Sequence, residues 1–174
     1  MMWRRIRQFV AACKAEITPA DEAFTSDFLN PVEKSLFDRL DAVTAKHSIN
    51  TARTVLRLAQ SYNLSATEKQ HAVKGALLHD IGKSLVKITK FYKVFYVLLG
   101  RFLFIGTWKP PHTIAGVNKF LYTMYVAKNH AKLGADLAEK AGLDSRLVRL
   151  ILYHHAENST DPIINIIREA DELN

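Results

Sequence analysis

The sequence contains very little cysteine, with Cys13 the only one among 174 residues. A single cysteine excludes a disulfide framework within the chain and is typical of proteins from a reducing compartment. We therefore expect a cytoplasmic protein in which Cys13 is an ordinary free thiol.

Long apolar runs are also missing. The most apolar segment, Phe91 to Gly106, is interrupted by Lys93 and Arg101 and falls short of the ~20 residues that a membrane-spanning helix needs. Near the start of the chain, the apolar residues 9–13 are too few for the core of a secretory signal peptide. Neither a membrane span nor a signal peptide is predicted, whereas contact with a membrane surface stays open.

Acidic residues are absent between Asp80 and Asp136, where nine lysines and arginines and ten aromatic residues fall. Such a segment would attract a phosphorylated substrate or an anionic membrane surface. We expect residues 81–135 to form a basic, aromatic cover, hinged near Pro110 and Pro111 because these prolines interrupt any helix. Nucleic acid is disfavoured as a partner, since the aromatic spacing suits core packing and no nucleic-acid motif accompanies it.

Helix-start signals recur along the chain. Asn30-Pro31 with Glu33, and Ser65 with Glu68, have the residue types and spacing of N-terminal caps. Further starts are indicated by Asp144 and by Asp161-Pro162, and a helix end is indicated by Gly142.

Apolar residues repeat at helical intervals, and no run alternates with a period of two. The sequence therefore predicts an all-α protein, of a length suited to one domain. Residues 1–30 are predicted to be an N-terminal helical extension and residues 31–174 the main domain. The predicted helices lie near residues 3–15, 19–28, 31–45, 47–62, 66–81, 85–99, 112–127, 129–141, 145–156 and 162–172.

Histidine and aspartate side chains of the types that bind metals recur in order along the chain. The set comprises His47, His79, Asp80, His130, one of His154 and His155, and Asp171. Asp80 shares a predicted helix face with small residues, and Asp171 lies on or beside an apolar stripe. A buried carboxylate in such a place costs several kcal/mol unless it is paired or binds a metal. His154 and His155 both follow apolar residues at helical spacing, and we favour His154.

The string LLHDIGK, which carries His79 and Asp80, resembles the HD-domain superfamily of metal-dependent phosphohydrolases. The resemblance extends from about Phe37 to Asp171, because the other histidines and the late aspartate follow in that family's order. It implies an HD-type helical bundle with two divalent ions. In that interpretation one ion is held by His47, His79 and Asp171, the other by His130 and His154, and Asp80 bridges them. Imidazole with carboxylate suits Mn, Fe, Co or Ni, and Mg stays open.

The resemblance also implies an activity, the cleavage of a phosphate ester or anhydride in a small nucleotide-like substrate by a two-metal-activated water. Asp80 and Lys83 are the predicted catalytic residues. If the helix continues through Gly82, the Lys83 ammonium lies over the site and contacts a phosphate oxygen or the leaving group. The alternative is a lysine favoured only by the end of a helix dipole.

Two other activities stay open from the sequence. Some HD-type proteins are di-iron oxygenases, and others are signalling modules that bind without catalysis. Within the phosphohydrolases, the stretch HHAENSTDP that begins at His154 lacks the Gly-Tyr-Pro signature of cyclic-dinucleotide phosphodiesterases. This departure argues against cyclic di-GMP as the substrate, while dinucleoside polyphosphates remain open. The sequence does not indicate an oligomeric state.

Overall fold

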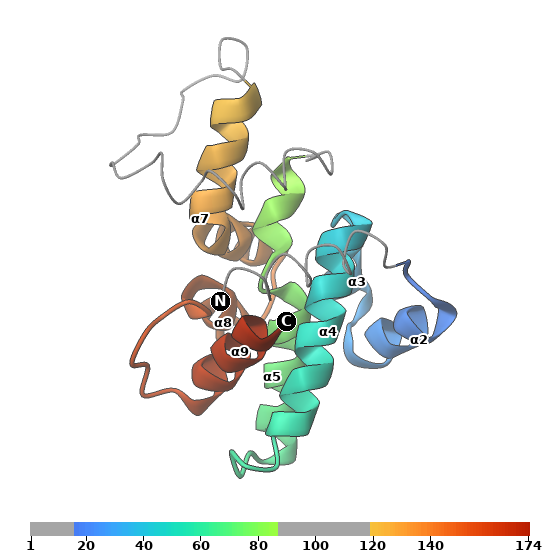
Figure 1. Ribbon diagram of the computed structural model, residues 1–174, viewed down its shortest axis with the longest axis vertical. Coiled ribbons are helices and arrows are strands. Elements are labelled where there is room, and N and C mark those ends of the chain that lie inside the picture. The colour runs from blue at the N-terminus through green and yellow to red at the C-terminus, as the bar shows by residue number, and fades with distance from the viewer. Residues whose placement is uncertain (1–15, 87–118) are drawn as a thin grey trace.

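The computed structural model describes residues 16–86 and 119–174, and within these ranges the chain is helical without a strand (Figure 1). The predicted all-α fold class is confirmed. The elements are α2 (Pro19–Phe28), α3 (Pro31–Phe37), α4 (Ala42–Leu58), α5 (Ala66–Leu78), the 3-10 helix η1 (Ile81–Leu85), α7 (Lys119–Lys140), α8 (Ser145–Tyr153) and α9 (Pro162–Leu173). The predicted helix 3–15, nearly all of the predicted helix 85–99 and the hinge at Pro110 and Pro111 lie outside the described residues.

The predicted helix caps form as the sequence indicates. Ser65 and Glu68 make a reciprocal capping box, in which the Ser65 N–H donates to Glu68 Oε2 at 2.9 Å. Asn30 caps α3 in the same way, and Asp144 and Asp161 cap α8 and α9. Gly142 ends α7 with a φ of +74°, a left-handed conformation that glycine adopts without strain.

Two of the predicted breaks between helices are wrong. The predicted helix 31–45 ends at Phe37, and a new helix begins after Asp41, whose side chain accepts from the N–H groups of Val43 and Thr44. His47 therefore lies inside α4 instead of opening a helix. The predicted break before His130 is also absent, because Asn129 stays helical and donates to the Tyr125 carbonyl at 2.8 Å.

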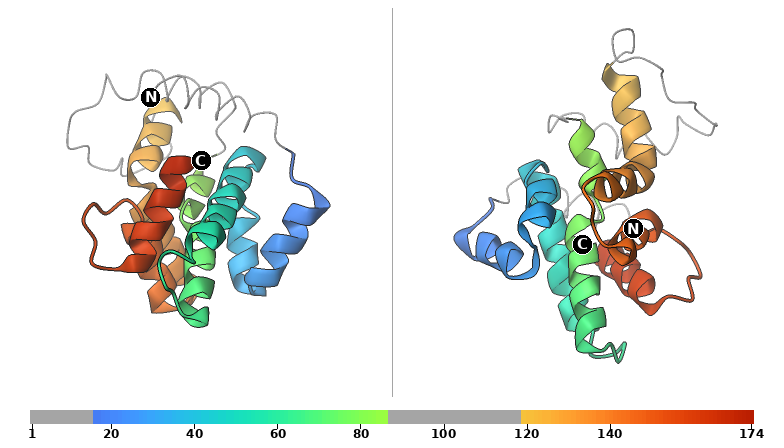
Figure 2. Two further views of the ribbon diagram at one scale, coloured as in Figure 1. Left: turned by 60° about the horizontal axis from the view of Figure 1, so that its bottom comes forward. Right: turned by 180° about the vertical axis from the view of Figure 1, so that it is seen from behind.

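Helix α5 occupies the centre of the described bundle, in contact with α2, α3, α4, α8 and α9 (Figure 2). Its residues Ala72, Val73, Ala76, Leu77 and Leu78 are fully buried. Burial of this apolar surface is the dominant stabilising term for such an element. The consequence for function is that the residues following α5 emerge in the middle of the bundle.

Helix α2 is attached to α4 through a buried carboxylate. Asp21 is fully buried and lies 2.6 Å from Lys46 Nζ and 2.8 Å from Arg53 Nη1, both on α4. It also caps its own helix by accepting from the Thr18 N–H. The predicted extension is thus packed against the main domain over its described part, and the boundary at residue 30 stays a prediction.

No helix in the described ranges is both long and apolar enough to cross a membrane.

Candidate metal centre

The site begins where α5 ends. The predicted helix 66–81 stops at Leu78, His79 is its C-terminal cap, and Asp80 leads into η1. His79 and Asp80 are each 1% exposed. The chain therefore places an imidazole and a carboxylate at the centre of the bundle, where neither has access to bulk water.

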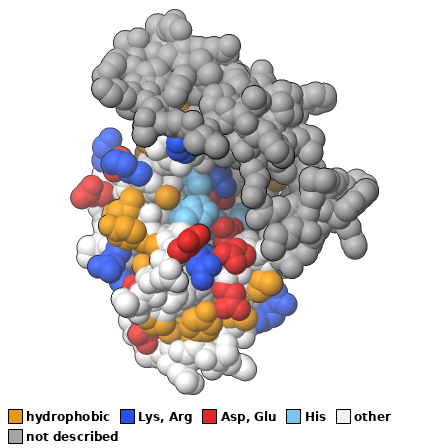
Figure 3. Space-filling view, turned by 60° about the vertical axis from the view of Figure 1, so that its left-hand side comes forward, with side chains coloured by type: hydrophobic (Ala, Val, Ile, Leu, Met, Phe, Trp, Pro, Cys, Tyr) orange, Lys and Arg blue, Asp and Glu red, His pale blue; other side chains and the backbone are white. Residues whose placement is uncertain are grey.

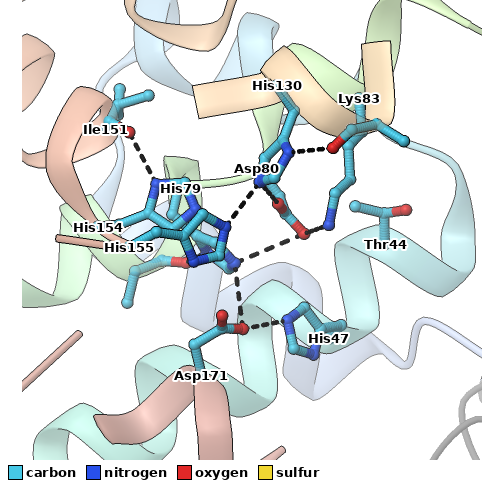
Figure 4. A network of polar contacts seen from close by, with 12 residues as sticks. Thr44, His47, His79, Asp80, Lys83, His130, Ile151, His154, His155 and Asp171 are labelled. Atoms are coloured by element: carbon cyan, nitrogen blue, oxygen red, sulfur yellow. Dashed lines mark hydrogen bonds and ion pairs between the residues drawn. The ribbon is translucent and has the colours of Figure 1, made fainter. Parts of the chain in front are cut away.

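Four other segments bring side chains to this point (Figure 4). His47 comes from α4, His130 from α7, His154 and His155 from the end of α8, and Asp171 from the last turn of α9. The structure thus brings together every residue that the sequence predicted for the metal site. Whether each binds a metal stays a prediction.

The first donor group consists of His47, His79 and Asp171. Asp171 Oδ1 lies 2.7 Å from His47 Nε2 and 3.5 Å from His79 Nε2. Among the described ion pairs, this carboxylate faces two imidazoles and no lysine or arginine.

The second donor group consists of His130, His154 and His155, whose ligand atoms lie within 4.8 Å of one another. The sequence prediction chose His154 over His155, yet the structure places both imidazoles in the cluster, with His155 Nε2 3.1 Å from His130 Nε2. His154 follows the helical stripe of α8, and the turn after Tyr153 brings His155 to the same side. Helical periodicity alone could not include both.

Asp80 lies between the two groups and presents one oxygen to each. Its Oδ2 is 3.5 Å from His79 Nε2, and its Oδ1 is 3.3 Å from His130 Nε2. The ligand atoms of His47, His79 and Asp80 also lie within 4.8 Å of one another. Asp80 is therefore placed to be shared by two cations.

Three of the histidines are oriented by their own helices. The Nδ1 atoms of His79, His130 and His154 lie 2.8, 2.8 and 2.7 Å from the carbonyl oxygen three residues earlier. A carbonyl only accepts, so Nδ1 donates and carries the proton. When the imidazole is neutral, as at His130 and His154, this tautomer directs the lone pair of Nε2 toward the centre of the site. Such orientation by an outer hydrogen bond is common among metal-binding histidines.

Several donor atoms at the centre lack a hydrogen bond within the described part of the chain. Nε2 of His79, Nε2 of His154 and Oδ1 of Asp80 are buried without one. Oδ1 of Asp80 instead faces His130 Nε2, which presents a lone pair. Buried polar atoms are rarely left without a partner, because desolvation without compensation is costly. A bound cation would satisfy these acceptors, so the residues fit a metal site.

The charges of the site follow from burial and from the two carboxylates. Burial disfavours the charged form of His79, but Asp80 and Asp171 outweigh it and raise its pKa to about 9. Burial lowers the pKa of His130 to about 4, and it also lowers the pKa values of His154 and His155. Burial opposes ionisation of Asp80 as well, yet Lys83 and the nearby histidines hold its pKa well below the usual range. The second donor group is therefore neutral, which is the form that binds metals.

Lys83 reaches the site by a route that the sequence did not predict. The α-helix does not continue through Gly82, but the tighter turn of η1 brings Lys83 Nζ to 2.6 Å from Asp80 Oδ2. The Lys83 side chain is one-third exposed, whereas Asp80 is buried. Figure 3 shows histidine side chains reaching the surface on one face, beside acidic and basic side chains.

An all-α bundle that gathers two donor groups around one aspartate has the features of a metal-binding helical domain. The family model for the HD domain matches residues 44–174, and the chain belongs to the HD domain family. HD domains bind divalent metal ions, and many are hydrolases. A comparison with curated proteins and one with solved structures gave no match.

Proposed function

We propose that this protein is a metal-dependent phosphohydrolase that cleaves a phosphate ester or anhydride in a small nucleotide-like molecule. The observation that carries the proposal is Asp80, which presents one carboxylate oxygen to each of two donor groups. Two divalent ions bound there would activate a water and neutralise charge on the phosphoryl oxygens.

The ligands divide between the two groups. One ion would be held by His47, His79 and Asp171, and the other by His130 and His154. Asp80 would bind both ions. His155 offers a further nitrogen to the second group. A set dominated by imidazole suits Mn, Fe, Co or Ni better than Mg, which prefers oxygen ligands.

Lys83 supplies a positive charge for the substrate. Its ammonium is held by the Asp80 carboxylate, so it is positioned beside the donor atoms while part of its side chain faces solvent. A lysine in this place can donate to a phosphate oxygen or to the leaving group, and donors fixed in advance stabilise developing charge most effectively. This arrangement favours a phosphorylated substrate over a neutral one.

The acid-free segment 81–135 supports an anionic partner on charge alone. We propose that it attracts the substrate in the cytoplasm, and an anionic membrane surface is the alternative partner. Most of this segment lies outside the described residues, so the proposal rests on its composition.

The experiment loads the purified full chain with Mn, Fe, Co, Ni or Mg in turn and supplies mono-, di- and polyphosphates and phosphodiesters. We expect phosphate or nucleotide release that depends on the metal and is lost with a chelator. If no substrate is cleaved while the iron-loaded protein consumes oxygen, the protein is an oxygenase. If metal binds tightly without either activity, it is a binding or signalling module.

A further inference from the structure

Two glycines meet where η1 packs against α7. A Cβ atom added to Gly82 would lie 2.1 Å from the carbonyl oxygen of His130 and 2.7 Å from the backbone nitrogen of Gly134. Both are backbone atoms, so neither can turn aside as a side chain would. Gly82 is not among the described glycines with a positive φ. A glycine is therefore required at this position for lack of space and not for its backbone conformation. A larger residue would force the two backbones apart.

This contact lies between two donor residues of the site. Gly82 follows Asp80 by two positions, and the carbonyl that it meets belongs to His130 itself. Gly134 is one helical turn after His130, on the same side of α7. A change in the distance between the two backbones would therefore change the 3.3 Å between Asp80 Oδ1 and His130 Nε2.

The same contact extends to α8. A Cβ atom added to Gly134 would lie 3.0 Å from Gly82 N and 3.1 Å from Ile151 Cγ2. The carbonyl of Ile151 accepts from Nδ1 of His154 and thereby orients that imidazole. The place occupied by the two glycines thus borders each of the segments that carry Asp80, His130 and His154.

We propose that Gly82 and Gly134 are positioning residues for the second donor group. Their lack of side chains lets α7 approach η1 closely enough for Asp80 to be shared with His130. The first donor group does not depend on this contact, because His47 and Asp171 lie on α4 and α9 and His79 caps the end of α5. The inference rests on the proposed function in assuming that both groups bind a metal.

The test compares Gly82→Ala and Gly134→Ala with Gly75→Ala as a matched control. Gly75 is also a buried glycine, four residues before His79, but a Cβ there would meet the side-chain ends of Ile167 and Leu150 at 2.7 and 3.2 Å. Metal per chain is measured by elemental analysis after loading with Mn, together with the unfolding temperature. Crystal structures give the distance from Asp80 Oδ1 to His130 Nε2.

We expect Gly82→Ala to bind about half as much metal as the natural protein and to show a longer distance between Asp80 Oδ1 and His130 Nε2. Gly134→Ala, with milder contacts, should fold and weaken the second ion by about tenfold, while Gly75→Ala keeps both ions. Unchanged metal content and an unchanged distance in the Gly82 and Gly134 variants would overturn the inference. Equal metal loss in Gly75→Ala would overturn it too. If the natural protein itself fails to bind two ions, the proposed function falls, and the distance in the variants still decides the inference.

Discussion

At the residue scale, the site depends on imidazole and carboxylate side chains whose donor atoms point toward one another at the centre of the described bundle. His79, His130 and His154 each use Nδ1 for a carbonyl of their own helix, and this leaves Nε2 for the site. The sequence could predict the identity and order of these residues, because the motif and the apolar stripes are local. It could not predict the tautomers, which depend on contacts with backbone carbonyls in the folded helices, or the inclusion of His155, which depends on the turn that ends α8.

The first prediction at this scale concerns Lys83. Replacing Lys83 with alanine should lower kcat with the metal content unchanged, because the ammonium would contact charge that develops in the reaction. The barrier should rise by about 1–4 kcal/mol, equivalent to roughly 5-fold to 10³-fold in rate. Steady-state phosphate release and elemental analysis on the same sample measure the two quantities.

Lys132→Ala is the control for Lys83, because the Lys132 side chain is 71% exposed and pairs with Asp136 on the surface of α7. The Lys132→Ala variant should have the same kcat and the same metal content as the natural protein. Equal turnover in the two lysine variants would remove Lys83 from the catalytic residues and leave it as an ordinary partner of Asp80.

At the scale of the elements, caps and apolar spacing predict that a helix is present more accurately than they predict where it begins and ends. Ser65 and Asn30 open helices where the sequence predicts, because a capping box is specified within four residues. The predicted helix 31–45 extends over the start of α4, which lies directly after its N-cap Asp41. The break predicted between residues 127 and 129 is absent from α7, because the side chain of Asn129 donates back into the same helix.

The prediction at this scale concerns Asp21, which joins α2 to α4. Its pKa is lowered relative to the unfolded chain: burial opposes ionisation, but the hydrogen bonds from Lys46 and Thr18 outweigh it. A carboxyl with a lowered folded pKa stabilises the protein above its unfolded pKa, about 4, and this stability is lost as the pH falls through lower values. Asp21→Asn should therefore lower the free energy of unfolding by about 2–3 kcal/mol at pH 7.

Urea unfolding at pH 7 and at pH 3 measures this effect, and the difference between Asp21→Asn and the natural protein should be smaller at pH 3. Asp38→Asn serves as the control, because Asp38 is half exposed and pairs with Lys34 on the surface of α3. Surface pairs of this kind contribute about 0–1 kcal/mol. Equal stability of the natural protein and Asp21→Asn at pH 7 would show that α2 is not held through this carboxylate.

At the scale of the whole molecule, five segments of the chain meet at one point. His47 and Asp171 are 124 positions apart and yet lie 2.7 Å from each other. Nothing local in the sequence specifies that approach, and it came from the family resemblance rather than from periodicity. The structure adds a physical basis, since α5 contacts α2, α3, α4, α8 and α9, and the residues that follow it, His79 and Asp80, lie at the centre of these helices.

Because bound metal would connect these distant segments, the free energy of metal binding should add to the free energy of unfolding. The central claim is that Asp80 is shared by two donor groups, and replacing it tests that claim most directly. The measurement is metal content per chain and unfolding temperature in saturating Mn for the natural protein, Asp80→Ala and the exposed control Asp136→Ala. We predict about two ions per chain in the natural protein and in Asp136→Ala. Asp80→Ala should lose both ions and the stabilisation that they give. An Asp80→Ala variant that keeps the natural metal content would contradict the account.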